Sequence, residues 1–300
     1  MCTLESSPPS PSPKPTPSLG VIGVGLLGHA LARRARAAGI RVAGFDIDPK
    51  CRPKLEALDA RMLSSARDVA EQYSLLLLAL PDDGVTRAIL EEITPALAAG
   101  ATILDVTTGD PEAAQQFGQS LAEHGVIYLD TPISGSSSQV LQGGALFMVG
   151  GPAQAFELLR DLLVRLAGEA IHTGPCGSAA KMKLVTNLVL GLNRAALAEG
   201  LVLAQSLGLE MPQALAVLTA SMAYSRIMDS KGEKMVQGDF TPQAKLSQHL
   251  KDVRLMLSAA ARSNQQLPLS QTHRELLERA VALGFGDLDN SAILRAIDRH

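Results

Sequence analysis

The first part of the chain alternates short, uniformly apolar runs with longer segments in which apolar residues recur at helical spacing. The apolar runs are LGVIGVG from Leu19, then RVAGFD, SLLLLALPD, ATILDVT, GVIYLD, GALFMVGG and EAIHTG. Segments such as LLGHALARRARAAG and PAQAFELLRDLLVRLAG lie between them. Strands that alternate with helices of about 10–15 residues indicate parallel strands with crossover helices on both faces. We therefore predict an α/β domain with a doubly wound parallel sheet over residues 19–177.

The pattern changes near residue 178, because no later segment reads as a convincing strand. Residues 178–207 are largely apolar, but Asn187, Arg194 and Glu199 interrupt the run. An unpaired charge inside a membrane is costly, so a buried helix fits this segment better than a membrane span. Further helices are predicted for MPQALAVLTA, SRIMDSKGEKMV, AKLSQHLKDVRLMLSAAARS and LPLSQTHRELLERAVALG. An all-helical domain is therefore expected over residues 178–300.

Composition narrows the choice of partners. The net charge is −3 and no basic cluster stands out, which argues against a nucleic-acid partner. The three cysteines are widely spaced and form no CxxC, which indicates reduced thiols in a cytoplasmic compartment. The six histidines show no metal-binding spacing, so we predict no metal site. Residues 1–18 hold six prolines and five serines without an apolar stretch, which predicts a disordered tail rather than a signal peptide.

A glycine-rich turn leads from the first predicted strand into a helix. It consists of Gly23, Val24, Gly25, Leu26, Leu27 and Gly28. Gly23 permits the tight turn, Gly25 lets a pyrophosphate approach the backbone, and Gly28 lets the helix pack on the strand. The helix start at Leu26 and Leu27 offers the pyrophosphate a positive helix end. This context predicts a Rossmann dinucleotide-binding domain, although a tight turn without a ligand can have the same glycines.

Asp46 ends the next predicted strand, 18 residues after Gly28. An acidic side chain here accepts hydrogen bonds from the adenosine ribose and repels a 2′-phosphate, which favours NAD over NADP. Lys50 and Arg52 follow closely, and their positive charges could weaken the preference for NAD. The alternative is that both are solvated charges on the next helix. We predict NAD as the cofactor, with NADP less favoured.

Two more strands end in residues suited to a ligand crevice. LALPDD ends one strand with Leu80 and Pro81, and DVTTGDP ends another with Thr108. The carboxyl ends of strands in an open parallel sheet face the ligand, so these three residues are expected to contact the cofactor. Helix capping is the alternative for Thr108, and it is the better interpretation of Asp110, which precedes a proline.

The loop DTPISGSSSQVLQGG follows a further strand. Ser134 offers a hydroxyl group, and Gly135 and Ser136 offer closely spaced backbone N–H groups, which together suit a carboxylate. By itself this evidence is weak, because a stretch rich in serine and glycine is often only a loop.

Two lysines open the long apolar helix. Lys181 and Lys183 are two residues apart and therefore lie on nearly opposite faces of a helix, whereas Lys183 and Asn187 are four apart and share a face. Lys181 is interpreted as a surface charge. Lys183 is the candidate for chemistry, and Asn187, one turn further on, is expected to hold its ammonium. The alternative is a surface lysine whose stem packs on the helix.

Three motifs occur in a characteristic order: GVGLLGHALARRARAAG, DTPISGSSSQVLQGGALFMVGG and GPCGSAAKMKLVTN. With them, residues 19–298 resemble the β-hydroxyacid dehydrogenases of the 3-hydroxyisobutyrate dehydrogenase type, in the 6-phosphogluconate dehydrogenase superfamily. The segments AKMKLVTN and GFGDLDNSA are most similar to the glyoxylate/succinic semialdehyde reductases.

The resemblance implies an NAD(P)-dependent oxidoreductase that transfers a hydride between nicotinamide and a short β-hydroxyacid or semialdehyde. It implies that Lys183 is the general acid and base. Substrate contacts are implied for Ser134, Gly135, Asn187 and Thr108, and a cofactor-side role for Lys251 beside Asp252. It further implies a small carboxylate substrate, no membrane partner, and a homodimer or homotetramer whose helical domain serves substrate binding and oligomerisation.

Some positions depart from the family pattern and leave the substrate open. Ser136 replaces a glycine, Val140 a smaller residue, Ala244 a phenylalanine and Ser247 a lysine. Two alternatives remain, an imine reductase-like enzyme and a non-catalytic dinucleotide-binding scaffold. Lys183 argues against the first, because that lysine is usually replaced in imine reductases. The intact glycine motif, Ser134, Lys183 and Asn187 argue against the second.

Overall fold

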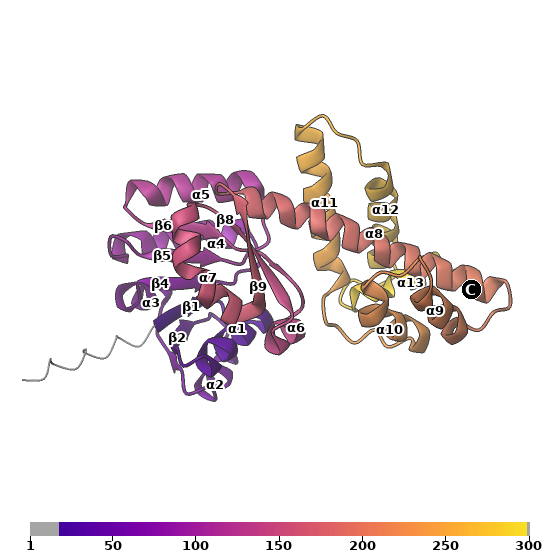
Figure 1. The fold of residues 1–300 in the computed structure, drawn as a ribbon, viewed down its shortest axis with the longest axis horizontal. Helices are drawn as coiled ribbons and strands as arrows, with labels where there is room; N and C mark the ends of the chain where they lie inside the picture. Colours follow the sequence, from indigo (N-terminus) through magenta and orange to yellow (C-terminus); the bar gives the residue numbers. More distant parts are fainter. Residues whose placement is uncertain (1–17, 299–300) are drawn as a thin grey trace, which may run out of the picture.

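The computed structural model describes residues 18–298, in which a sheet flanked by helices is followed by a group of helices (Figure 1). The strands are β1 (Ser18–Ile22), β2 (Arg41–Phe45), β3 (Arg61–Met62), β4 (Leu75–Leu78), β5 (Thr102–Asp105), β6 (Ile127–Asp130), β7 (Ile133–Ser134), β8 (Ala145–Gly150) and β9 (Gly168–Gly174). The predicted tail, residues 1–18, is one residue too long at its C-terminal end, because Ser18 begins β1 and pairs with Arg41. The rest of that tail lies outside the described residues.

The strand order is β3-β2-β1-β4-β5-β6-β8-β7, with β9 beside β8. Strands β1 to β6 run parallel, as the alternating pattern predicted. Strand β8 departs from that expectation, because it pairs antiparallel with β6 and β7 and parallel with β9. A short connection through α6 (Ser137–Gln142) suffices between β7 and β8, since antiparallel neighbours need no long crossover. The order reverses between β1 and β4, where ligands bind in doubly wound sheets.

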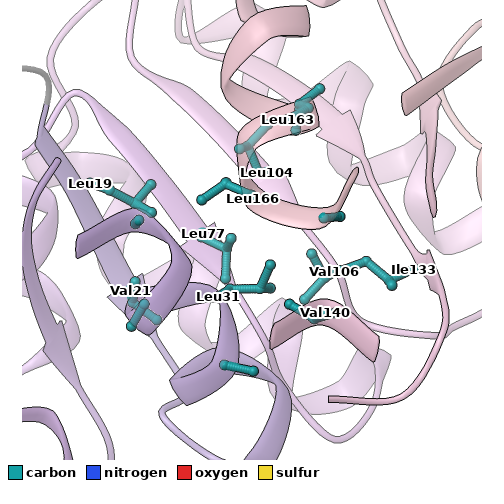
Figure 2. Close-up of a cluster of buried hydrophobic side chains, with 14 of the residues drawn as sticks. Leu19, Val21, Leu31, Leu77, Leu104, Val106, Ile133, Val140, Leu163 and Leu166 are labelled. Carbon is teal, nitrogen blue, oxygen red and sulfur yellow. The ribbon is translucent and has the colours of Figure 1, made fainter. Parts of the chain in front are cut away.

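Alternating side chains bury both faces of the sheet. In β4, Leu77 packs toward one cluster, whereas Leu76 and Leu78 pack toward the other. The first cluster (Figure 2) lies under α1 (Leu26–Ala37), α6 and α7 (Ala153–Ala167). The second lies under α3 (Ala66–Gln72), α4 (Asp83–Ile93) and α5 (Pro111–Glu123). Helix α2 (Cys51–Glu56) and the 3₁₀ turn η1 (Thr94–Ala96) complete this half.

Helix α8 (Ser178–Ser206) joins the two halves. Its N-terminal part packs against α5, β8 and β9, and its C-terminal part belongs to the helical core with Leu197 and Leu201. Around it lie α9 (Met211–Ala220), the π-helical turn η2 (Met228–Gly232), α10 (Glu233–Gln237), α11 (Leu246–Arg262), α12 (Pro268–Ala282), the 3₁₀ turn η3 (Asn290–Ile293) and α13 (Leu294–Ile297). The stretch predicted as one helix in SRIMDSKGEKMV is thus divided between η2 and α10.

Helix α8 is long and apolar enough to cross a membrane by length and composition alone. In the fold it instead contacts α5, α9, α11, α12 and α13. Its buried side chains include Asn187 and Arg194, which would be costly to place in lipid. These contacts account for the buried apolar residues of α8, such as Leu197 and Leu201, at its central position between the two halves (Figure 1).

Candidate active site

The glycine-rich turn between β1 and α1 has the geometry that a dinucleotide requires. Gly23 has φ +89°, and a Cβ there would lie 2.3 Å from the Ala79 carbonyl oxygen. A Cβ on Gly28 would lie 1.9 Å from the Gly23 oxygen, so helix and strand approach too closely for any side chain. A Cβ on Gly25 would meet nothing within 4 Å. Because Gly25 also precedes the first residue of α1 without a side-chain cap, there is room for a phosphate at the helix end.

Asp46 lies directly beside this turn. Its Oδ2 accepts a hydrogen bond from the Val24 amide at 2.6 Å, and its Oδ1 accepts one from the Asp48 amide at 2.8 Å. The carboxylate therefore holds the glycine turn in place. Each oxygen keeps a further lone pair, so both remain able to accept from ribose hydroxyls. Leu26, at the start of α1, is 76% exposed at this edge of the sheet.

The ends of β4 and β5 meet a lysine from the helical half. The Lys251 ammonium on α11 donates to the Pro81 carbonyl at 3.1 Å and to the Thr108 carbonyl at 3.3 Å. The neighbouring Leu80 amide donates to the Thr107 hydroxyl at 3.2 Å. The predicted cofactor residues Pro81, Thr108 and Lys251 are thus brought together, although they are far apart in sequence.

Asp110 caps α5, as predicted. Its carboxylate accepts from the Glu112 amide at 2.9 Å, with Pro111 at the first helical position. It also binds Arg262 of α11, whose guanidinium lies 3.0 and 2.9 Å from its two oxygens and 2.9 Å from Glu112. This exposed ion-pair group adds a second link between the two halves beside Lys251.

Buried polar groups also hold the backbone at the carboxyl end of β5. Asp105, at the end of β5, accepts from the Thr107 amide at 2.9 Å and from the Tyr128 hydroxyl at 2.7 Å. Burial raises the pKa of the Asp105 carboxyl to about 6, against the opposing effect of these hydrogen bonds. The backbone at Thr107 is therefore fixed by a carboxyl group that the sequence pattern did not identify.

Lys183 reaches the loop that contains Ser134. Its ammonium donates to the Ile133 carbonyl at 2.6 Å, one residue before Ser134. Burial lowers the pKa of Lys183, and the negative charge of Asp252 acts in the opposite direction. Lys181 is exposed on the other side of the helix. The two lysines thus differ in environment as their spacing predicted.

Asn187 faces the same region as Lys183 but bonds elsewhere. Its Nδ2 donates to the Asp252 Oδ2 at 3.1 Å, and both side chains are buried. The sequence predicted that Asn187 would hold the Lys183 ammonium. In the structure that ammonium instead donates to the Ile133 carbonyl. Asn187 and Asp252 instead form a pair beside it, which joins α8 to α11.

The Ser134 loop is shaped by its departures from the family pattern. Gly135 has φ +142°, and a Cβ there would lie 2.8 Å from the Ala145 Cβ. Ser136 caps α6 through a reciprocal pair with Gln139, in which each side chain accepts from the other's backbone amide. Val140 is fully buried in the cluster of Figure 2. Both substitutions therefore serve the local fold of α6.

Asp130 is a residue of this region that the sequence analysis missed. It ends β6, and its two carboxylate oxygens accept from the amides of Gly177 at 2.8 Å and Ala180 at 2.9 Å. The first turn of α8, and with it Lys183, is thereby fixed to the sheet. A carboxylate at a strand end, in YLDTP, was the available signal, but its partner 50 residues away could not be read from the sequence.

Residues 18–298 contain no group of three or more histidine, cysteine, aspartate or glutamate side chains arranged to hold a metal ion. The polar groups gathered at the strand ends are lysines, amides, hydroxyls and single carboxylates. Such a set can bind an anion, donate or accept a proton, and stabilise an oxyanion.

Known proteins resemble this chain over nearly its whole length. Residues 18–174 match the family described as the NAD-binding domain of 6-phosphogluconate dehydrogenase, and residues 177–297 match that described as NAD-binding of NADP-dependent 3-hydroxyisobutyrate dehydrogenase. The chain is 30% identical to 2-hydroxy-3-oxopropionate reductase from Escherichia coli, over 93% of this chain and 97% of that protein. It is 28% identical to L-threonate dehydrogenase from Cupriavidus necator, over 93% and 95%.

Solved structures give the same result. A 3-hydroxyisobutyrate dehydrogenase from Salmonella typhimurium superposes with a TM-score of 0.86 at 26% identity, covering 93% of this chain and 99% of that one. The Mycobacterium tuberculosis 3-hydroxyisobutyrate dehydrogenase with L-serine gives 0.87 at 25% identity, covering 95% and 100%. An imine reductase from Pseudomonas sp. shares the fold, with a TM-score of 0.66 at 22% identity over 94% and 100%. The chain therefore belongs to the β-hydroxyacid dehydrogenase family, whose members are NAD(P)-dependent oxidoreductases.

Proposed function

We propose that this protein interconverts a short β-hydroxyacid and its semialdehyde, with Lys183 as the general acid and base. One observation carries the proposal: the Lys183 ammonium lies 2.6 Å from the Ile133 carbonyl, directly before Ser134 and Gly135. A proton-transfer group and a candidate carboxylate cradle are therefore adjacent. A substrate whose hydroxyl group is close to its carboxylate fits that arrangement.

The cofactor supplies the hydride acceptor or donor when it is bound. Its pyrophosphate would be held by the turn at Gly23, Gly25 and Gly28 and the helix start at Leu26 and Leu27. The Leu80, Pro81 and Thr108 backbone would line the nicotinamide side, where Lys251 fixes two of these carbonyl groups. NAD is the proposed preference, because the Asp46 carboxylate would repel a 2′-phosphate.

Proton transfer and substrate binding are assigned to residues of the chain itself. For oxidation, neutral Lys183 accepts the hydroxyl proton, and for reduction its ammonium returns that proton to the carbonyl oxygen. The lowered pKa of Lys183 supports both roles, because it increases the neutral fraction near neutral pH without removing the ammonium. Ser134 and the Gly135 amide would bind the carboxylate, and Asn187, fixed by Asp252, would orient the substrate.

The charge around this site supports an anionic substrate. Lys183, Arg194 and Lys251 all interact electrostatically with the single carboxylate of Asp252. Of these cations, Lys183 lies beside the Ser134 loop, where a substrate carboxylate would place a negative charge close to its ammonium. A neutral cyclic imine would not.

We also propose that the helical half, residues 178–300, forms a homodimer or homotetramer, while residues 19–177 bind the cofactor. Helices α8 and α9 leave large apolar side chains exposed to solvent in the single chain. They include Met182, Val185, Val189, Leu190, Leu203 and Val217. Exposed apolar residues in such number on adjacent elements are typical of subunit interfaces. Sedimentation equilibrium would show the assembly, and a monomer at micromolar concentration would contradict it.

The activity is tested by oxidation of a panel of hydroxyacids with NAD and with NADP. The panel should vary the chain between the carboxylate and the hydroxyl group, and should include glycerate, 3-hydroxyisobutyrate, threonate and 4-hydroxybutyrate, with the corresponding aldehydes assayed for reduction. We expect turnover of acids whose hydroxymethyl or aldehyde group lies close to the carboxylate. Reduction of cyclic imines without turnover of any acid would contradict the proposal, and cofactor binding without any turnover would favour a scaffold.

A further inference from the structure

Asp83 is a half-buried carboxylate at the start of α4 that the proposed mechanism does not use. The cap of α4 is supplied by its neighbour Asp82, whose Oδ1 accepts from the Val85 amide at 3.0 Å. The Asp83 carboxylate instead reaches the loop that follows β5, where its Oδ2 accepts from the Asp110 amide at 2.7 Å. It therefore joins two loops that are 27 residues apart in the chain.

The same carboxylate lies directly against Gly109. A Cβ on Gly109 would lie 1.6 Å from the Asp83 Oδ1, 2.4 Å from its Cγ and 2.7 Å from its Oδ2, and these are the three nearest heavy atoms. The φ of Gly109 lies outside the left-handed region, so this contact, rather than backbone strain, excludes a side chain at position 109. The loop after β5 can approach Asp83 this closely because residue 109 is a glycine.

Thr107 makes a second connection between the two loops. Its buried hydroxyl oxygen accepts from the Leu80 amide at 3.2 Å and from the Thr86 hydroxyl of α4 at 3.4 Å. Thr107 precedes Thr108, and the residues bound by Asp83 follow it. The backbone of Thr108 is therefore held to the loop after β4 on both of its sides.

Lys251 depends on the spacing of these two loops. Its ammonium donates to the Pro81 carbonyl at 3.1 Å and to the Thr108 carbonyl at 3.3 Å, and each acceptor belongs to one of the loops. A single ammonium can reach both oxygens only while the loops stay close together. Asp83 follows Pro81 by two residues and binds the amide two residues after Thr108, so its hydrogen bond limits how far the acceptors can separate.

We propose that Asp83 is a positioning residue for the cofactor, which acts by holding the Pro81 and Thr108 carbonyls at the spacing that Lys251 bridges. Gly109 is the residue that makes this contact possible. Asp83 touches neither cofactor nor substrate in this role. The inference rests on one part of the proposed function, the place of these loops beside the nicotinamide. It does not depend on the substrate, on the proton-transfer group, or on the choice between NAD and NADP.

The first test measures cofactor affinity without substrate. Isothermal titration calorimetry is carried out with whichever of NAD and NADP the wild-type protein binds more tightly. Asp83→Ala removes the acceptor, and loss of one positioning hydrogen bond should raise Kd by about threefold to tenfold. Asp83→Asn should stay within about twofold of the wild type, because its amide oxygen can accept the same hydrogen bond from Asp110. An unchanged Kd in Asp83→Ala would overturn the inference.

Asp82→Ala is the matched control. It removes the adjacent carboxylate and the cap of α4, which should lower Tm, but it does not touch the loop after β5. We expect its Kd to equal that of the wild type. A merely structural role for Asp83 would lower Tm in both variants and leave both Kd values unchanged. An equal rise of Kd in Asp82→Ala would also overturn the inference, because the effect would then come from α4 as a whole.

Lys251→Met separates this inference from the proposed site. If these loops serve the cofactor, Lys251→Met should raise Kd. A weakened Lys251→Met beside an unchanged Asp83→Ala would overturn the inference and leave the proposed site intact. Weaker binding in both variants supports the inference, even if no hydroxyacid is turned over.

Gly109→Ala gives an independent test of the contact itself. Its methyl group would displace the Asp83 carboxylate, so Gly109→Ala should raise Kd about as much as Asp83→Ala does. With both substitutions present, Kd should rise no further, because the methyl group then occupies the space that the carboxylate has left. Additive losses in the double variant would overturn the inference, since they would show that the two residues act separately.

Discussion

Asp130 at the end of β6 accepts a 2.9 Å hydrogen bond from the amide of Ala180, in the first turn of α8. The same carboxylate accepts from Gly177, and Lys183 follows Ala180 by three residues. The sheet therefore sets the position of the helix that carries the proposed acid and base. Its geometry does not depend on the helical half alone.

Asp130→Asn should weaken this connection. The new amide group places a donor against one of the two backbone N–H groups, leaving it buried without a partner, which costs about 1–3 kcal/mol. We expect a lower free energy of unfolding in urea and a lower kcat. Asp161→Asn, which changes an exposed carboxylate on α7, is the control and should alter neither quantity. Full stability in Asp130→Asn would show that α8 is held by other contacts.

Asp46 should determine the cofactor. Wild-type kcat/KM should be higher with NAD than with NADP, because a 2′-phosphate meets the Asp46 carboxylate. Asp46→Ser, combined with an arginine at the 88%-exposed Ile47, should narrow that gap. Equal efficiencies in the wild-type enzyme, or an advantage for NADP, would contradict the role given to Asp46. Because Asp46 also holds the Val24 amide, Tm must be measured alongside.

Asp105 should make stability depend on pH. Its pKa is about 6 in the folded protein and about 4 in an unfolded chain, so the folded state binds the additional proton between these values. The free energy of unfolding contributed by Asp105 should therefore fall as pH rises from 4 to 6, by about 3 kcal/mol at most. Urea titrations across this range should show a shallower fall in Asp105→Asn. Parallel curves for the two proteins would refute the assignment.

Ser134 should act mainly in binding. If its hydroxyl group holds the substrate carboxylate equally in ground and transition states, Ser134→Ala should raise KM by about tenfold with little change in kcat. Ser138→Ala, at an exposed position on the adjacent α6, should leave both constants unchanged. A fall in kcat at constant KM would instead place Ser134 in the chemical step.

Local sequence patterns predicted the parts of the fold that depend on neighbouring residues. The apolar runs marked β1, β2, β4, β5 and β6, and the glycine spacing marked the turn before α1, because each reflects backbone geometry within a few positions. The family relation was also confirmed. The antiparallel placement of β8 was not predicted, because its apolar run carries no sign of strand direction.

Polar pairs between residues far apart in the chain could not be predicted from the sequence. Asn187 is paired with Asp252 across 65 positions, and Asp130 holds Ala180 across 50. Asn187 was expected to bond Lys183 because the two share a helix face, but the approach of α11 offers it a carboxylate instead. Arg194 was interpreted only as a residue that interrupts an apolar run, since its burial depends on helices that come later in the chain.

The central claim is that Lys183 transfers the proton, and the two lysines of α8 give its most direct test. The measurement is single-turnover oxidation of the best hydroxyacid by Lys183→Ala and Lys181→Ala, with NAD binding titrated separately. Lys183→Ala should lose at least about 10²–10⁴-fold in rate while still binding NAD, and Lys181→Ala should lose less than about tenfold. A nearly inactive Lys181→Ala beside an active Lys183→Ala would contradict the account.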